Sequence, residues 1–243
     1  MMQIAELRER TRHVEGWLTD GQAVTLYRLA RAATARGAIV EIGSWKGRST
    51  CWLAMGSREG AGTTVVAIDP HTGASEQKAR AATVWTFDEF RANLKSVGVE
   101  DMVRPIVATS SDAAADFNEP VELIFIDGAH EYNLVKMDFE LWFPKVINGG
   151  VMAFHDTIGR EGPRRVVEQM VFRSHRFRNV RFVDSMTVAE KVEQNTAAER
   201  LRNRYVLLVK DAYDMAYRAY QGTGMRLPVP VRSAVKRMVQ ALH

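Results

Sequence analysis

Short apolar runs alternate with longer stretches of helical periodicity along most of this chain. A short apolar run bounded by glycine or polar residues is typical of a strand that is buried on both faces of a sheet. Because helical stretches separate the runs, their order favours a parallel sheet covered by helices on both sides. The runs predict strands at residues 38–42, 64–68, 103–107, 121–126 and 150–154.

The pattern is less regular after residue 156. Residues 180–183 predict a sixth strand, and two stretches compete for a seventh. One is 205–209, a compact apolar run between charged residues, and the other is the weaker stretch 186–192. We favour 205–209, paired antiparallel with the sixth strand. The predicted fold class is therefore α/β, with a Rossmann-like, doubly wound, mostly parallel sheet of seven strands.

Helical patterns flank the sheet at both ends of the chain. The N-terminal part predicts one or two helices, one of them starting at the pair Thr19-Asp20. Beyond the sheet, two more helices are predicted at 211–221 and 231–242. These boundaries divide the chain into an N-terminal helical cap at 1–36, a central α/β domain at 37–210 and a helical C-terminal extension at 211–243.

The composition narrows the class of protein. Of the 243 residues, 46% are hydrophobic and 26% charged, which suffices for one α/β core. The 33 basic and 29 acidic residues leave a net charge of only +4, so we expect no nucleic-acid partner. No apolar run approaches the roughly 20 residues of a membrane span. The single cysteine, Cys51, excludes an internal disulfide and favours a cytoplasmic location.

A glycine loop follows the first predicted strand. It reads Gly43-Ser44-Trp45-Lys46-Gly47 and leads into a helix whose first turn holds Ser49. Glycine permits a tight turn, and the free NH groups at a helix N-terminus attract an anionic ligand group. Trp45 stands where a G-x-G-x-x-G loop has its second glycine, so a pyrophosphate fingerprint and an NAD-dependent oxidoreductase are disfavoured. The loop predicts a cradle for a carboxylate or a phosphate.

Two further strand ends add polar groups at the same edge of the sheet. Asp69 ends the second strand, where an acidic side chain can accept hydrogen bonds from both hydroxyls of a ribose. Ser110 and Ser111 follow the third strand and suit the edge of an adenine. Together with the loop, these groups indicate a nucleoside that carries a small zwitterion, and S-adenosylmethionine fits that description.

The fourth and fifth strands end in groups that suit a metal ion. Asp127 follows the fourth strand, and the pair His155-Asp156 follows the fifth. Hard carboxylate oxygens at such an opening suit Mg²⁺, which keeps several waters and can bind two adjacent oxygens of an acceptor. A structural interpretation stays open: Asp127 would cap the next helix, and Asp156 would hydrogen-bond His130 or His155.

These motifs together resemble the class I S-adenosylmethionine-dependent methyltransferases, and among them the macrocin-type sugar O-methyltransferases. The spacing Glu41-x-Gly43-x-Trp45-x-Gly47-x-Ser49 is also similar to that of catechol O-methyltransferase. The likeness covers about residues 17–210 and does not reach the tail. The segments that carry it are residues 40–53, 66–71, 87–107, 124–131 and 149–157.

The resemblance implies that S-adenosylmethionine is the cofactor and suggests a role for each group. Trp45 and Ser49 would lie near its methionine carboxylate, Asp69 at the ribose, and Ser110 and Ser111 beside the adenine. The predicted cofactor-binding residues are Glu41, Gly43, Ser44, Trp45, Gly47, Ser49, Asp69, His71, Ser110, Ser111 and Asp127.

The resemblance also implies a metal and a base. Asp127 and Asp156 stand where relatives have metal ligands, while His155 replaces a further aspartate of catechol O-methyltransferase, so a softer or weaker site is an open alternative. We predict Asp127, His155 and Asp156 as ligands of a divalent ion, most simply Mg²⁺. His130 stands at the step of the relatives' lysine base, and an imidazole titrates near pH ~6.5, so we predict it as the general base. His155 competes for that role.

We therefore expect an S-adenosylmethionine-dependent O-methyltransferase that acts on a hydroxyl of a sugar or glycan precursor. A general likeness to mycobacterial enzymes that methylate the 1-hydroxyl of methylated mannosides adds such a mannoside to the candidate acceptors. A catechol-type or other small-metabolite acceptor is the nearest alternative. An alternative from another class is that the chain is a non-catalytic cofactor-binding or assembly protein. The expected partners are a small-molecule or oligosaccharide acceptor and a second copy in a homodimer.

Overall fold

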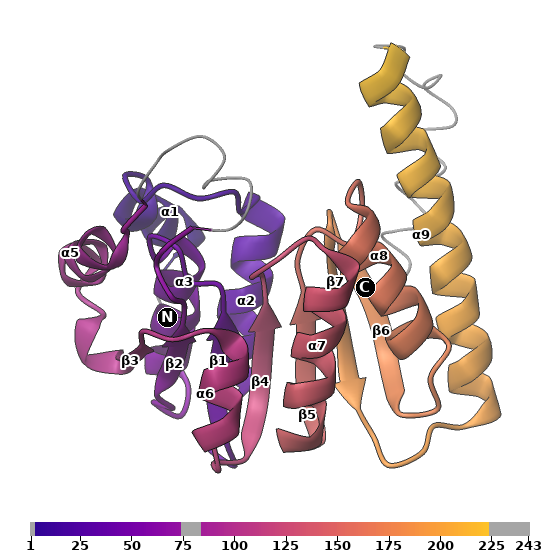
Figure 1. Cartoon of the computed structure of the whole chain (residues 1–243), viewed down its shortest axis with the longest axis horizontal. Helices are drawn as coiled ribbons and strands as arrows, with labels where there is room; N and C mark the ends of the chain where they lie inside the picture. Colours follow the sequence, from indigo (N-terminus) through magenta and orange to yellow (C-terminus); the bar gives the residue numbers. More distant parts are fainter. Residues whose placement is uncertain (1–2, 74–83, 224–243) are drawn as a thin grey trace.

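The structure, a computed structural model, describes residues 3–73 and 84–223 (Figure 1). Within these residues, seven strands form one sheet in the order β3-β2-β1-β4-β5-β7-β6. Strands β1 to β5 pair in parallel, whereas β7 runs antiparallel to both β5 and β6. This confirms the predicted fold class. The strands are β1 (Ala38–Ile42), β2 (Val65–Ile68), β3 (Val103–Ile106), β4 (Val121–Ile126), β5 (Val146–Phe154), β6 (Phe177–Val183) and β7 (Met186–Lys191).

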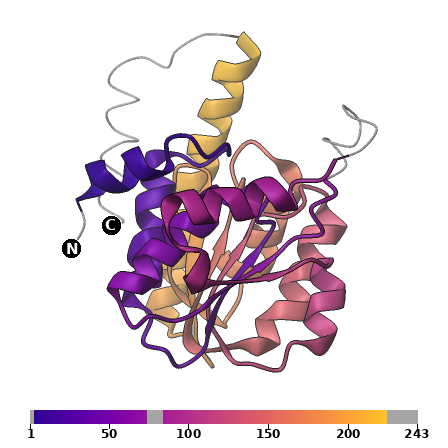
Figure 2. The same ribbon diagram turned by 90° about the vertical axis from the view of Figure 1, so that its left-hand side faces the viewer.

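Helices cover both faces of the sheet, and each face has its own hydrophobic cluster. Alternate residues of a strand point to opposite faces, so Ile39 packs in one cluster and Val40 in the other. In Figure 2 the purple N-terminal helices and the pink helices lie on opposite sides of the strands. The helices are α1 (Ile4–Thr11), α2 (Asp20–Ala32), α3 (Arg48–Glu59), α5 (Phe87–Val97), α6 (Ser110–Asp116), α7 (Tyr132–Trp142), α8 (Glu161–Val166) and α9 (Ala197–Thr223). Two 3-10 helices, η1 (Glu100–Met102) and η2 (Phe143–Lys145), and a π-helix, η3 (Val167–Phe172), complete the described elements.

Two helices precede the sheet, as the N-terminal pattern predicts. Helix α2 begins with a capping box: the Thr19 hydroxyl accepts the Gln22 NH, and the Gln22 side chain accepts the Thr19 NH. A Cβ at Gly56 of α3 would overlap the backbone of Tyr27, so this glycine lets α2 and α3 pack closely. Helix α2 is therefore held firmly against α3.

The prediction for the seventh strand is wrong. Residues 205–209 belong to α9, and the seventh strand is β7, which lies in the weaker alternative 186–192. In α9 the run has helical periodicity, because Val206 and Val209 are buried while Tyr205 and Leu208 are exposed. A short apolar run cannot be distinguished from a segment of a helix by composition alone.

Helix α9 runs along the outer edge of the molecule beside β6 (Figure 1). It crosses residue 210 without a break, so the division between 37–210 and 211–243 stays a prediction that falls inside a helix. The helix predicted at 211–221 is part of α9, and the one predicted at 231–242 lies outside the described residues. No helix in the part of the chain that the structure describes is long and apolar enough to cross a membrane.

Candidate functional site

Four candidate residues follow the ends of adjacent strands and extend the hydrogen bonding of the sheet. We call Gly43, Asp69, Asp127 and His155 the strand-end row. Their NH groups donate to carbonyl oxygens of the neighbouring strands at 2.9, 3.2, 2.8 and 3.0 Å, respectively. Because the carboxyl ends of parallel strands meet at one edge of the sheet, the row forms a continuous line of candidate groups.

The glycine loop has a backbone that only glycine tolerates at two positions. Gly43 has φ of +87°, and a Cβ there would overlap the carbonyl oxygen of Asp127. Gly47 has φ of +89° and forms the N-cap of α3. Between them, Trp45 also has a positive φ of 47°. The loop therefore turns sharply and exposes its backbone next to the helix N-terminus, as expected for the cradle of an anionic group.

Asp69 holds the loop in this conformation. Its two carboxylate oxygens accept hydrogen bonds from the backbone NH groups of Trp45, at 2.8 Å, and His71, at 2.6 Å. Each carboxylate oxygen has a second lone pair, so Asp69 can still accept hydrogen bonds from a ligand. The predicted ribose acceptor thus has a structural role in the strand-end row as well.

Polar atoms behind the loop lack partners. The indole NH of Trp45 and the Oε1 atom of Glu41 are buried, and neither forms a hydrogen bond with a described residue. The hydroxyl of Thr50 donates to the other oxygen of Glu41. Burial raises the pKa of Glu41 to about 7, and hydrogen bonds from Ser49 and Thr50 oppose that shift. A glycine cradle with unpartnered buried polar atoms fits a zwitterionic ligand; Ser44 and Ser49, also buried, complete this group.

The groups predicted for the adenine lie at the start of α6. The Trp142 indole NH donates to Ser110 at 2.9 Å, and Ser111 lies 3.0 Å from Thr109, oxygen to oxygen. Both serines are half-buried. Behind Ser110, burial raises the pKa of Asp138 to about 6. The two hydroxyls are therefore fixed in place by other side chains.

His71 is more deeply enclosed than a residue that lines an open pocket. Its side chain is buried, and its Nδ1 atom lies 2.9 Å from the Thr86 hydroxyl. The rings of Phe87 and Phe90 lie 5.1 and 5.2 Å from the imidazole, centroid to centroid. His71 connects the loop after β2 to α5, and its contact with a cofactor stays a prediction.

Asp127, His155 and Asp156 form a compact cluster. One ligand atom from each lies within 4.8 Å of the others. His155 Nδ1 is 2.9 Å from an oxygen of Asp127 and 3.5 Å from one of Asp156, yet it forms no hydrogen bond of normal geometry. Two carboxylates suit Mg²⁺, and the imidazole extends the choice to softer divalent ions. The donor set therefore fits a divalent cation.

Burial and charge act in opposite directions on the pKa values of this cluster. Burial would lower the pKa of His155, but the charges of Asp127 and Asp156 raise it to about 10. Burial would raise the pKa of Asp156, but the hydrogen bond from His130 and the charge of His155 hold that pKa well below its usual range. A divalent ion bound here would replace the proton on the Nδ1 atom of His155.

The sequence analysis missed Gln22. This buried side chain on α2 presents Oε1 to His155 Nε2 at 3.3 Å, and its amide nitrogen donates to Ser185 at 2.9 Å. Because the same Oε1 accepts the Thr19 NH, the atom facing His155 is an oxygen, and His155 Nε2 must carry the hydrogen. Gln22 thus orients Nδ1 toward the carboxylates. Its signal in the sequence was the capping box, which predicts only a helix start.

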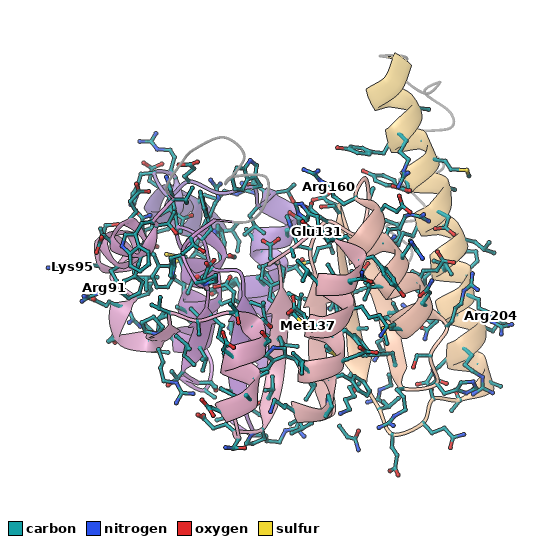
Figure 3. All side chains as sticks on the ribbon, viewed as in Figure 1. Arg91, Lys95, Glu131, Met137, Arg160 and Arg204 are labelled. Carbon is teal, nitrogen blue, oxygen red and sulfur yellow. The ribbon has the colours of Figure 1, made fainter. Side chains whose placement is uncertain are left out.

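His130 lies in the loop after β4, on the outer side of the cluster. Its Nε2 atom is 3.0 Å from an oxygen of Asp156, and about a third of its side chain is exposed. A Cβ at Gly162 would overlap the His130 carbonyl, so α8 packs directly on this loop. Figure 3 labels Glu131, at the end of the loop after β4, and Arg160, at the end of the loop after β5.

Helix α9 fixes the loop that follows Asp156. Lys210 is buried and donates to the Thr157 carbonyl at 2.6 Å, and the Gly159 NH donates to Asp214 at 2.8 Å. Burial lowers the pKa of Lys210 to about 8. These contacts were not predicted, because Lys210 directly follows the run that was interpreted as a strand and Asp214 lies in the predicted C-terminal extension.

The central part of the chain is similar to a known protein family. A family described as a methyltransferase domain matches residues 40–157, just under half of the chain. This segment contains most of the candidate site. Residues 40–157 are therefore similar to a methyltransferase domain, which supports the predicted class.

Two curated proteins share parts of the sequence. The chain is 44% identical over 54 residues to uncharacterized protein y4gI of Sinorhizobium fredii and 27% identical over 120 residues to uncharacterized protein R132 of Acanthamoeba polyphaga mimivirus. These matches cover 22% and 48% of this chain. They span only 6% and 50% of the relatives' own lengths.

Solved structures share the fold. Cofactor-bound Rv0187 from MTB is 21% identical with a TM-score of 0.56, covering 79% of this chain and 90% of that one. The O-methyltransferase TomG from Streptomyces achromogenes, in complex with SAM, is 20% identical with a TM-score of 0.54, covering 78% and 89%. An O-methyltransferase from Bacillus cereus in complex with SAH is 22% identical with a TM-score of 0.55, covering 77% and 90%. The fold is thus that of the class I S-adenosylmethionine-dependent methyltransferases.

Proposed function

We propose that this protein is an S-adenosylmethionine-dependent O-methyltransferase. The observation that carries the proposal is the strand-end row, in which a glycine cradle, a ribose-type acid and a cluster of metal-ligand type follow adjacent strands. The names of TomG and the Bacillus cereus protein, both O-methyltransferases bound to SAM or SAH, support the same cofactor and reaction.

Gly43 and Asp69, which we call the cofactor half of the row, would bind S-adenosylmethionine together with their neighbours. When bound, this cofactor supplies an electrophilic methyl group on a sulfonium. The loop from Gly43 to Gly47, with Ser49, would bind its carboxylate through backbone NH groups and hydroxyls. Asp69 would accept hydrogen bonds from the ribose, and Ser110 and Ser111 would contact the adenine. Glu41, Ser44, His71 and Asp127 would complete the surroundings of the cofactor.

The acceptor half would hold a divalent metal at Asp127, His155 and Asp156. A bound Mg²⁺ or softer ion lowers the pKa of an acceptor hydroxyl and orients it. Gln22 would support this site, because it keeps His155 Nδ1 directed at the carboxylates. Asp127 adjoins both halves of the row and would therefore contact both the cofactor and the metal.

His130 would act as the general base. Its contact with Asp156 favours the tautomer with the hydrogen on Nε2, so that Nδ1 is the atom that accepts the proton of the acceptor hydroxyl. The carboxylate would then stabilise the imidazolium that forms. His155 is the weaker candidate for this role, because it is enclosed and already engaged by Gln22 and Asp127.

The proposed acceptor is a sugar or a glycan precursor, a methylated mannoside included, as the macrocin-type resemblance implies. A catechol-type acceptor would use the same metal and base. The proposal includes a homodimer, and it includes a cytoplasmic location because the single cysteine, Cys51, is a buried free thiol.

Calorimetric titration with S-adenosylhomocysteine tests the cofactor half directly. The chelator-treated chain should bind it with micromolar affinity, and a panel of sugars and catechols should then show methyl transfer that depends on added Mg²⁺. Failure to bind would disprove the proposal at its first step. Binding without transfer to any acceptor would instead support a non-catalytic cofactor-binding protein.

A further inference from the structure

Helix α9 carries an apolar stripe on its outer face. Four large side chains are strongly exposed there: Leu201 is 72% exposed, Tyr205 47%, Leu208 69% and Met215 67%. With the exposed Ala212, they are spaced by four, three, four and three residues. This is the repeat of a coiled-coil seam, in which apolar residues face a second helix. We call these five residues the outer stripe.

The outer stripe lies opposite the face by which α9 packs on its own domain. The packed face buries Asn203, Val206, Lys210 and Asp214. Arg204, next to the stripe, points away from the sheet in Figure 3. Since α9 already contributes a buried face to the core, the exposed leucines and methionine add nothing to the fold. An exposed apolar surface of this kind marks a site of association.

We propose that two copies of this chain dimerise through the outer stripe, with α9 antiparallel to the partner's α9. In an antiparallel pair centred on Leu208, a residue seven positions before the centre meets one seven positions after it. Leu201 then packs against the partner's Met215, and Leu208 meets the partner's Leu208. Tyr205 lies between the partner's Leu208 and Ala212, so that a large side chain packs beside a small one.

The charges beside the stripe favour the same arrangement. Arg204 and Asp211 lie on one flank, seven residues apart, which is about 10 Å along a helix. They are too distant to pair within one helix. An antiparallel pair brings Arg204 to within one residue, about 1.5 Å along the axis, of the partner's Asp211, and symmetry forms this contact twice. A parallel pair would instead align each residue with its own copy, which leaves no opposite charges level with each other.

The other arginines near this flank are engaged within the chain. Arg200 donates to the Asn195 carbonyl at 2.8 Å, and Arg218 pairs with Asp214 at 2.9 Å. They are therefore held away from the seam. Arg204 and Asp211 remain as the charged pair that can select the partner.

Analytical ultracentrifugation of the full chain tests the surface. One helix pair buries a small area, so we expect a dimer that dissociates in the micromolar range. Leu208→Asp should raise the dissociation constant by about 100-fold or more, because it introduces two charges at the centre of the seam. The matched control is Leu134→Asp on α7, which changes a leucine that is 41% exposed outside the stripe and should leave the dimer intact. Circular dichroism melting confirms that each variant folds.

Charge reversal tests the antiparallel arrangement. Arg204→Asp and Asp211→Arg should each weaken the dimer by about tenfold, because each puts like charges level with each other. The double variant should restore the wild-type dissociation constant. A monomeric wild type, or a dimer that survives Leu208→Asp, overturns the proposed surface. A double variant no tighter than the single variants overturns the antiparallel pairing.

Discussion

The two halves of the strand-end row are held in different ways. In the cofactor half, Asp69 binds backbone NH groups, and Gly43 fits against the backbone of Asp127. In the acceptor half, Asp127, His155 and Asp156 hold one another through charge. A close backbone approach such as that of Gly43 to Asp127 constrains shape whatever the pH, whereas contacts between charged side chains depend on protonation and on bound ions. The proposed cofactor half is therefore the more fixed in shape, and the proposed acceptor half is the more sensitive to pH and to ions.

The largest expected effect separates the reaction from cofactor binding. His130→Ala should lower turnover by about 10² to 10⁴ and leave S-adenosylhomocysteine affinity nearly unchanged, because His130 belongs only to the acceptor half. Steady-state kinetics and calorimetry measure the two quantities. His175→Ala, outside these loops, is the matched control. Normal turnover in His130→Ala would remove this residue from the mechanism.

The next effect concerns the cofactor half alone. Gly43→Ala should weaken S-adenosylhomocysteine binding by about 100-fold, because the new Cβ overlaps the Asp127 carbonyl and a positive φ strains alanine. Gly62→Ala is the control: its φ is also positive, at 71°, but its Cβ would meet nothing within 4 Å. Equal binding losses in the two variants would show that strain, and not the close contact, explains the result.

A third prediction tests the pH dependence of the contact between α9 and the loop that follows the acceptor half. The pKa of Lys210 is lowered by burial to about 8 in the folded chain, so the unfolded chain binds its proton more readily. Between pH 8 and the ordinary lysine value near ~10.4, stability should therefore rise with pH, by about 2 kcal/mol for this residue. Lys210→Met should lose that rise. Urea unfolding of both proteins across this range measures it, and parallel curves would contradict the prediction.

The smallest effect concerns Gln22. Gln22→Leu should weaken Mg²⁺ or Mn²⁺ binding by about tenfold, because His155 loses the oxygen that orients it. Thr19→Ala is the matched control, because it removes the helix cap at a cost of about 1 kcal/mol but keeps the contact between Gln22 and His155. Metal titration followed by calorimetry compares the two. Equal affinities would mean that Gln22 serves only the helix.

The sequence predicts the parts of the site that lie in continuous motifs. Each of these groups begins one or two positions after a strand: the glycine loop, Asp69 and the three residues of the candidate metal cluster. A correct prediction of the strand therefore also locates the residue. Gln22 and Lys210 act across 133 and 53 positions, and no local pattern reports such contacts. The same limit explains the wrong seventh strand, because tertiary packing decides whether a short apolar run becomes helix or strand.

The strand-end row also fixes the distance between Asp69 and His155. Asp69 follows β2 and His155 follows β5, and between them lie β1 and β4, so three strand spacings separate the two residues. At about 4.8 Å per spacing, this distance is roughly 14 Å. Insertions in the loops above leave it unchanged, whereas a slip of one residue in strand register would displace the row. Sequence changes in the loops can therefore alter which molecule is accepted while the span from the ribose-type acid to the metal-type cluster stays constant.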